Sequence, residues 1–420
     1  MFTLKEESLR TKRILYALMA IVLAVSAFTA LYYGDAFLLG TYEKMDNDDV
    51  KYMYAAKVLL EEGTLVYKSY PNPTLFIMPG FPVMLAFFMW IFGDYENTAI
   101  AVRLFQCVLQ AASVYLLFVI ARHMFNSRVA LVACIIAALY PPNYYTSGVI
   151  LSEGIFQIIF LLMMCMTLYA LQKPSVGKYI AIGALLALCA YFKPQFILFP
   201  LIIGVTWLIR RVPFKKMVLY TATIVLTACL LLSPWWVRNY VHFGKFIPFT
   251  DSSGNPMLMG VLPGEPSPGF FKEYPQYSPD VYDDSTEKVG HIILYSLKTK
   301  PFETLKWYLF DKTILAFEQT FYWLDFWGMS YHFVLALHII LCVLGVAGFI
   351  AALIKRRGDI LVAALTVVYV IGVHIPFVQF SRYMYPILFI FTIFAAYLIA
   401  VLIQSLSSRR SSSVTRLYPQ

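Results

Sequence analysis

Long apolar runs, separated by short basic or aromatic segments, occupy most of the chain. A helix of about 20 apolar residues crosses the hydrocarbon core of a bilayer, so the pattern predicts an all-α, polytopic membrane protein. About ten spans are expected, in a single transmembrane domain that covers residues 1–420. The predicted spans are residues 14–33, 99–121, 129–145, 151–171, 179–192, 195–209, 217–234, 331–354, 360–377 and 386–404.

One further apolar stretch, residues 79–92, is too short to be treated in the same way. As a helix it would cover about 21 Å, whereas the hydrocarbon core is roughly 30 Å thick. We therefore interpret it as an interfacial helix. A second such segment, residues 298–327, is aromatic and amphipathic and is suited to lie along the membrane surface.

The distribution of charge supports this topology. With residues 79–92 in the interface and the N-terminus in the cytoplasm, the cytoplasmic segments hold 18 of the 33 Lys and Arg residues but only 3 of the 24 Asp and Glu residues. If residues 79–92 spanned the membrane, the basic loops after them would face outward, against the positive-inside rule. The net charge of +9 is therefore assigned to topology and anionic lipid headgroups, and not to a nucleic-acid partner.

This topology makes the protein a multi-pass component of the cell membrane with both termini in the cytoplasm. The first run follows four basic residues and is longer than a usual signal-peptide core, so we expect a retained signal-anchor helix. Two long segments, residues 34–97 and 235–330, lie outside the cytoplasm. Function is expected where these segments meet the helix ends.

Cysteine and histidine give little indication of metal or redox chemistry. All six cysteines fall inside apolar runs and form no CxxC pair, so they are expected to be buried, free thiols. The six histidines show no HExxH or HxxxH spacing. A zinc site is thus unsupported by any motif.

Carboxylates cluster in the first outer segment, in the stretch MDNDDVKYMYAAKVLLEEG that begins at Met45. Asp48 and Asp49 precede a predicted helix over residues 50–60, where acids favour the helix dipole, so capping and catalysis both remain open. Asp46 is interpreted as a solvated neighbour. Glu153, at the head of a later span, has the same two interpretations.

Three basic residues lie at the outer ends of other spans. Lys193 occurs in AYFKPQF, Arg238 in SPWWVRNYVHFGKF and Arg382 in VQFSRYMYPIL. Each could instead snorkel to the interface or anchor an aromatic belt. Together, however, three cations fit a phosphate or pyrophosphate headgroup, and nearby acids fit deprotonation of a hydroxyl or a metal contact.

The order of these motifs resembles the family 39, protein O-mannosyltransferase-like glycosyltransferases of the GT-C membrane fold. The resemblance covers nearly the whole chain: DDVKYMYAAKVLL, then PGFPVMLAFFMWIFG, the acid after YPPNYYTSGVILS, FKP, PWWVRNYVHFGKFIPF and SRYMYP. Such enzymes take a sugar from a polyprenyl-phosphate carrier.

The resemblance implies a role for each candidate residue. Asp48, four residues before Tyr52, matches the catalytic aspartate, with Asp49 as its acidic neighbour and Glu153 as the second outer carboxylate. The residues implied at the donor phosphate are Lys193, Arg238 and Arg382, and those implied to shape the substrate site are Tyr52 and Tyr383. Many relatives have Arg in place of Lys193, and some carry a large extracytoplasmic domain that is not expected here.

The expected function is therefore an inverting transfer of a sugar from a polyprenyl phosphate to an extracytoplasmic hydroxyl, on a glycolipid, an envelope polymer or a protein. The sequence identifies no cofactor, and a divalent cation held by Asp49 and Glu153 stays open. A lipid-linked oligosaccharide ligase or polymerase is the near alternative. A flippase or transporter would need charges at helix centres, and a scaffold would leave the one-sided charges unexplained.

Overall fold

The structure is a computed structural model that describes residues 2–67, 72–354 and 360–417. Within these ranges the regular elements are helices, with one isolated β-bridge between Phe326 and Met329. The α-helices are α1 (Leu9–Tyr33), α2 (Asp48–Glu62), α3 (Gly80–Phe92), α4 (Tyr95–Met124), α5 (Ser127–Ala138), α6 (Pro142–Gly148), α7 (Glu153–Gln172), α8 (Val176–Phe192), α9 (Pro200–Ile209), α10 (Phe214–Phe243), α11 (Gly254–Leu258), α12 (Pro268–Glu273), α13 (Thr286–Thr299), α14 (Pro301–Lys306), α15 (Lys312–Phe317), α16 (Tyr331–Ile354), α17 (Ile360–His374), α18 (Ser381–Met384) and α19 (Leu388–Leu417). Four short helical turns, η1 (Gly34–Phe37), η2 (Pro194–Phe196), η3 (Trp307–Asp311) and η4 (Tyr385–Ile387), join some of them.

The predicted all-α, multi-pass architecture is confirmed, and each of the ten predicted spans is helical over most of its length. By length and hydropathy, six helices of the described chain can cross a membrane. A seventh candidate is the pair α5 and α6, which are bent by 58° relative to each other. The bend falls at Pro141 and Pro142, where proline removes a helix hydrogen bond and disfavours helical geometry in the preceding residue.

Three of the predicted spans form helices shorter than the about 20 residues that usually cross a bilayer. Helices α8 and α17 have 17 and 15 residues, and η2 with α9 covers Pro194–Ile209. Pro194 ends α8 after Phe192 because a proline ring restricts the residue before it to extended geometry. Lys193, at that position, has φ −142° and ψ 92°.

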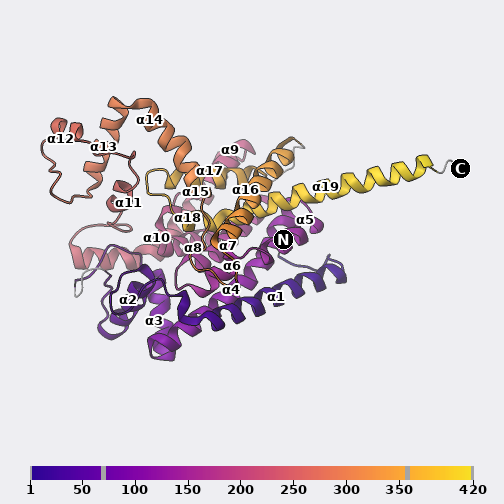
Figure 1. Ribbon diagram of the computed structural model, residues 1–420, viewed down its shortest axis with the longest axis horizontal. Coiled ribbons are helices and arrows are strands. Elements are labelled where there is room, and N and C mark those ends of the chain that lie inside the picture. Colours follow the sequence, from indigo (N-terminus) through magenta and orange to yellow (C-terminus); the bar gives the residue numbers. More distant parts are fainter. Residues whose placement is uncertain (1, 68–71, 355–359, 418–420) are drawn as a thin grey trace.

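The first long segment folds as two helices that pack on each other. Asn47 caps α2 by accepting a hydrogen bond from the Asp48 amide, and the helix ends at Gly63 in left-handed geometry. Helix α3 has 13 residues, in agreement with the short piece predicted at residues 79–92. In Figure 1 both helices lie beside the end of α1, at the lower left of the bundle.

The second long segment begins later than the sequence indicates. Helix α10 continues through Pro234 to Phe243, so Arg238 lies on a helix. The chain beyond it forms α11 to α15, of which α12 to α14 extend to the upper left in Figure 1. The predicted amphipathic run at residues 298–327 is helical from Pro301 to Phe317.

Glycine allows a close contact between helices α16 and α19. A Cβ atom added at Gly348 would lie 1.9 Å from the Phe394 carbonyl oxygen, and one at Gly345 would lie 2.8 Å from the Phe391 Cβ. Small residues at such crossings let two helix backbones approach and gain packing contacts inside a membrane.

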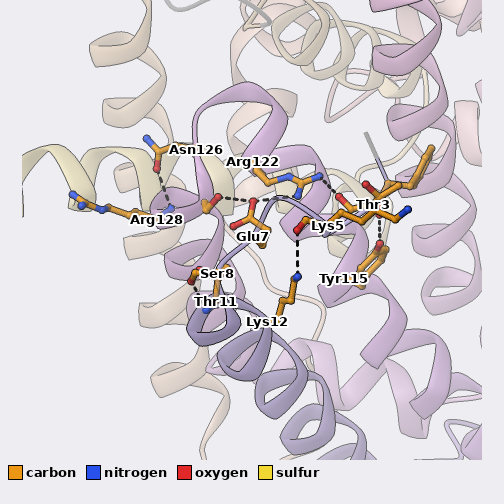
Figure 2. A network of polar contacts seen from close by, with 12 residues as sticks. Thr3, Lys5, Glu7, Ser8, Thr11, Lys12, Tyr115, Arg122, Asn126 and Arg128 are labelled. Carbon is orange, nitrogen blue, oxygen red and sulfur yellow. Dashed lines mark hydrogen bonds and ion pairs between the residues drawn. The ribbon is translucent and has the colours of Figure 1, made fainter.

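A polar network fastens the N-terminal segment to the ends of α4 and α5 (Figure 2). The Glu7 carboxylate accepts hydrogen bonds from Arg122 Nη1 at 3.1 Å and from Ser127 Oγ at 2.8 Å. The Tyr115 hydroxyl also donates to the backbone carbonyl of Phe2. This network fixes the start of α1 against helices α4 and α5.

Two buried side chains of α4 hold the link between α6 and α7 in place. Arg103 Nε donates to the Gly148 carbonyl at 3.0 Å, and Nη1 forms an ion pair with Asp35 at 3.1 Å. Gln106 Nε2 donates to the carbonyls of Ser147 and Val149 at 3.2 and 2.9 Å. The irregular backbone that leads into Glu153 is therefore hydrogen-bonded although it is buried.

Candidate functional site

A cavity of about 430 Å³ lies where the predicted outer ends of the helices meet the two long segments. Its walls combine aromatic side chains with a few charged and hydroxyl groups, as is usual for small-molecule sites. The lining residues are Tyr52, Phe76, Ile77, Met78, Phe81, Leu151, Ser152, Glu153, Phe192, Lys193, Pro194, Gln195, Phe249, Thr250, Ser252, Ser253, Pro256, His374, Phe377, Arg382 and Tyr383.

Asp48 lies beside this cavity and contacts its lining through Arg382. The carboxylate accepts a 2.9 Å hydrogen bond from Arg382 Nη2 and a 2.6 Å hydrogen bond from the Tyr67 hydroxyl. Burial alone would raise the pKa of Asp48, but the Arg382 charge and these two hydrogen bonds outweigh burial and lower the pKa. The carboxylate is therefore ionised at neutral pH, and its two oxygens have fixed directions.

Glu153 holds the two cations of the lining. It is the first residue of α7, and its Oε1 accepts a 2.9 Å hydrogen bond from Lys193 Nζ. Arg382 Nε lies 3.9 Å from the same oxygen. Lys193 comes from the end of α8 and Arg382 from α18, so helix ends distant in sequence place alternating charges side by side.

The four charges form a chain in the order Asp48, Arg382, Glu153 and Lys193. Two anions balance two cations, so an anionic ligand would be held by N–H donors at defined positions and not by excess charge. Glu153 and Lys193 are both buried. Separating such a pair leaves an unpaired buried charge, which is costly.

Tyr52 and Tyr383 line the cavity, at the places where the sequence predicts them. The Tyr52 ring lies 5.1 Å from Phe81 and 5.4 Å from Tyr67 between ring centroids. The ring centroid of Tyr383 lies 5.8 Å from Lys193 Nζ. Both rings line the same cavity as Glu153, Lys193 and Arg382.

Asp49 is not brought to the cavity. Its buried carboxylate accepts hydrogen bonds from the backbone amides of Leu39, at 2.5 Å, and Val50, at 2.8 Å. Burial nevertheless raises its pKa. Asp49 thus joins the segment after η1 to the start of α2, and it faces the backbone rather than Glu153.

A divalent cation does not fit between Asp49 and Glu153. Asp49 bonds to backbone amides, whereas Glu153 bonds to Lys193. Among the residues that the structure describes, no group of three His, Cys, Asp or Glu side chains could hold a metal ion.

Arg238 lies outside the lining and faces a neighbouring segment. Its Nη1 donates to the Thr74 carbonyl at 2.9 Å and to Asn239 Oδ1 at 3.1 Å, and the guanidinium stacks over Trp235 at 5.0 Å. It supports the backbone before Phe76, which does line the cavity.

Sequence reasoning missed several residues of the site. Tyr67 lies in irregular chain 19 residues after Asp48 and carries no local signal. His374 ends an apolar helix, a position that reads as an ordinary core residue. Thr250, Ser252 and Ser253 line one wall from a loop with no periodicity.

Residues 73–237 match the family model described as dolichyl-phosphate-mannose-protein mannosyltransferase. No curated protein sequence matches the chain significantly. The matched residues include Glu153 and Lys193, while Asp48 and Arg382 lie outside them.

Solved membrane enzymes share the architecture. The archaeal oligosaccharyltransferase AglB from Archaeoglobus fulgidus, in complex with an inhibitory peptide and a dolichol-phosphate, aligns with a TM-score of 0.57 at 12% identity over 98% of this chain and 53% of its own. ArnT from Cupriavidus metallidurans, bound to undecaprenyl phosphate, aligns with a TM-score of 0.53 at 16% identity over 92% and 60%. The chain thus spans about half of the length of the structures it matches.

These comparisons confirm the predicted resemblance. The chain has the GT-C membrane fold and is similar to the protein mannosyltransferase family. At these identities the structural likeness extends to the fold alone.

Proposed function

We propose that the protein is a membrane glycosyltransferase that moves a sugar from a polyprenyl-phosphate carrier to an acceptor hydroxyl. One observation carries the proposal: a fixed, ionised Asp48 is joined through Arg382 to the Glu153–Lys193 pair in the wall of a 430 Å³ cavity. The site thus offers a base on one side and N–H donors for a phosphate on the other. The match to a family named for a dolichyl-phosphate-mannose donor and the undecaprenyl phosphate bound to ArnT support the carrier.

In this proposal the donor phosphate contacts Lys193 and Arg382. As the bond between the anomeric carbon and the phosphate oxygen breaks, negative charge grows on the phosphate. Preorganised N–H groups stabilise such charge without reorganising at the moment of reaction. Arg238 acts indirectly, through the backbone at Thr74 that precedes the lining residue Phe76.

Asp48 acts as the general base. The acceptor oxygen attacks the anomeric carbon from the face opposite the phosphate, its proton passes to the Asp48 carboxylate, and the polyprenyl phosphate leaves, so the anomeric configuration inverts. Asp49 positions the base through the start of α2, and Glu153 orients the cations. No step is routed through a metal ion, because the carboxylates do not converge on one.

The proposal places the active site on the extracytoplasmic side and both termini in the cytoplasm. The excess of Lys and Arg in the opposite loops supports this orientation. The interfacial helices α2 and α3 border the site, where they would shape lateral access for the lipid carrier.

Transfer of a lipid-linked oligosaccharide is a second candidate, favoured by the architectural match to an oligosaccharyltransferase. The cavity volume argues for the single sugar. At about 430 Å³ it lies near the lower end of the roughly 300–1,000 Å³ typical of small-molecule sites.

The purified full chain in lipid nanodiscs, incubated with polyprenyl phosphates that carry one sugar, tests the proposal. We expect release or transfer of the sugar, and loss by a factor on the order of 10² to 10⁴ in Asp48→Asn. Asp46→Asn is the matched control, because Asp46 is exposed and its carboxylate accepts from the Thr41 amide. Full activity in a correctly inserted Asp48→Asn protein would refute the assignment of the base. Intact movement of the lipid across vesicles without cleavage would instead indicate a flippase.

A further inference from the structure

Three buried polar atoms in the cavity residues have no hydrogen-bond partner among the described residues: Glu153 Oε2, His374 Nε2 and Arg382 Nε. Buried polar atoms in folded proteins are nearly always hydrogen-bonded, so each such atom calls for an explanation. The three atoms belong to side chains that line one cavity. This common position indicates that a ligand completes their hydrogen bonds.

The His374 ring has a defined orientation. It is the last residue of α17, only 3% of its surface is exposed, and Nδ1 lies 2.7 Å from the Val370 carbonyl oxygen. A carbonyl oxygen only accepts, so Nδ1 carries the hydrogen. The ring also stacks on Tyr383, with 5.2 Å between centroids.

Nε2 is therefore the free position of the ring. The Tyr383 ring on which His374 stacks also lies 5.8 Å from Lys193 Nζ and 5.7 Å from the Arg382 guanidinium. Burial disfavours a positive charge on the His374 ring. A neutral imidazole with its hydrogen on Nδ1 presents a lone pair at Nε2, so His374 is a hydrogen-bond acceptor toward the cavity.

A second buried histidine shows what a purely structural role looks like. His338 is 2% exposed, and both ring nitrogens have partners: Nδ1 lies 2.7 Å from the Tyr140 hydroxyl and Nε2 lies 3.0 Å from the Phe317 carbonyl. His338 does not line the cavity. His374 differs in both respects.

The chemistry of the unpartnered atoms selects the part of the ligand that meets them. Glu153 Oε2 and His374 Nε2 are acceptors and need donors, whereas an ionised phosphodiester offers only acceptors. The phosphate can satisfy Arg382 Nε but neither of the other two atoms. A sugar carries several hydroxyl groups and supplies the missing donors.

We propose that His374 Nε2 accepts a hydrogen bond from one hydroxyl of the transferred sugar, with a second hydroxyl on Glu153 Oε2, which makes His374 a specificity-determining residue. This inference rests on the proposed function and adds to it the group that reads the sugar. His374 takes no part in bond breaking. A site that hydrogen-bonds one particular hydroxyl discriminates strongly against an analogue that lacks this hydroxyl.

The test measures binding of two kinds of probe to the full chain in nanodiscs: bare undecaprenyl phosphate, and undecaprenyl phosphate linked to mannose, glucose, galactose or arabinose. In His374→Phe we expect affinity for the best sugar-bearing probe to fall roughly tenfold or more, and affinity for the bare carrier to stay within about twofold. Phenylalanine keeps a ring to stack on Tyr383 but removes the acceptor. His332→Phe is the matched control, because His332 is exposed and lies outside the lining.

Monodeoxy analogues of the best sugar give a second measurement that needs no variant. One analogue should bind the wild-type protein roughly tenfold more weakly, and His374→Phe should no longer distinguish it from the parent sugar. Equal losses for bare and sugar-bearing carriers in His374→Phe, or deoxy analogues that all bind like the parent, overturn the inference while leaving the carrier assignment intact. Failure of the wild-type protein to bind any probe, including the bare carrier, overturns the proposed function and this inference together.

Discussion

Arg382 donates a 2.9 Å hydrogen bond to Asp48 across a separation of 334 residues in the sequence. The same guanidinium lies 3.9 Å from Glu153 through its Nε. One planar cation therefore fixes the distance between the carboxylate beside the cavity and the carboxylate inside it. Its five N–H donors in a rigid fork suit this bridging position.

Arg382→Lys should distinguish the bridging geometry of Arg382 from its positive charge. Lysine keeps the positive charge but carries all its donors on one nitrogen, so it cannot reproduce the separate positions of Nη2 at Asp48 and Nε beside Glu153. We expect kcat/KM for the lipid-linked sugar to fall on the order of 10²-fold, as for the loss of one preorganised donor. Arg128→Lys, at an exposed position, is the control for the same exchange. Wild-type activity in Arg382→Lys would show that charge alone is sufficient.

Tyr67→Phe should move the acid limb of the pH–rate profile to higher pH. The Tyr67 hydroxyl donates to Asp48 Oδ1 at 2.6 Å and is one of the groups that lower the pKa of Asp48 against burial. Without this donor the pKa of Asp48 rises, so the reactive carboxylate is protonated at a higher pH. The stability that ionised Asp48 contributes is present above its unfolded pKa and is lost as pH falls through the folded pKa, and this loss also begins at a higher pH in the variant.

The measurement is kcat/KM against pH on the acid side of neutrality, with thermal unfolding over the same range. Tyr16→Phe, at an exposed tyrosine of α1, is the control. An unchanged or downward-shifted acid limb in Tyr67→Phe would argue against Asp48 as the group whose ionisation limits the reaction.

How much of this site the sequence predicts depends on where each residue lies. Asp48, Glu153, Lys193 and Arg382 sit at helix ends, and a regular topology brings alternate helix ends to the same side of the membrane. Their grouping could therefore be expected. Their pairing order depends on side-chain packing that no periodicity encodes.

The residues that sequence reasoning misplaced or missed have no such positional constraint. Asp49 follows Asp48 directly, yet it points to the backbone amides of Leu39 and Val50, because neighbouring helical side chains point in different directions. Arg238 was expected at the phosphate, but α10 continues past Pro234 and carries it to Thr74. Tyr67 reaches Asp48 through irregular chain, whose course the sequence does not specify.

Tyr385→Phe should weaken the packing that positions Arg382 and Glu153. Tyr385 follows Arg382 by three residues, as Gln157 follows Glu153 by four, and its buried hydroxyl lies 3.1 Å from Gln157 Oε1. It also lies 2.9 Å from Asn143 Oδ1 and from Thr146 Oγ1. The Tyr385–Gln157 contact thus joins the same two segments as the Arg382–Glu153 contact, about one helical turn further along each. We expect its loss to destabilise the fold by about 1–2 kcal/mol. Because it would also shift Arg382 relative to Glu153, we expect kcat to fall by more than KM rises.

Tyr397→Phe provides the matched control for that change. Tyr397 is also buried, but its hydroxyl has no hydrogen-bond partner among the described residues. Thermal unfolding and steady-state kinetics of both variants distinguish the effect of losing the Tyr385 hydrogen bonds from the effect of removing a hydroxyl oxygen. Equal effects in the two variants would contradict a positioning role for Tyr385.

Lys312 fastens a wall of the cavity to the end of α17. Its buried Nζ donates to the carbonyls of Gly260 at 2.7 Å and Ile375 at 2.6 Å. The Val378 amide donates to the Pro256 carbonyl at 2.7 Å beside it. Pro256 belongs to the cavity lining, so the position of the wall depends on this attachment.

Lys312→Met should abolish one pH dependence of stability and loosen the wall. Burial lowers the pKa of Lys312 to about 8, against an ordinary value of 10.5. Between these values the unfolded chain still binds the proton that the folded chain has released, so the stability of the wild-type protein rises with pH across this window. The methionine side chain does not titrate, so this rise in stability disappears, and the two carbonyls lose their donor.

We expect faster limited proteolysis of residues 244–330 in Lys312→Met at pH 9, compared with wild type and with the exposed control Lys272→Met. A wild-type protein whose proteolysis rate does not fall between about pH 8 and 10, or a variant cleaved no faster than the control, would show that Lys312 does not hold the wall.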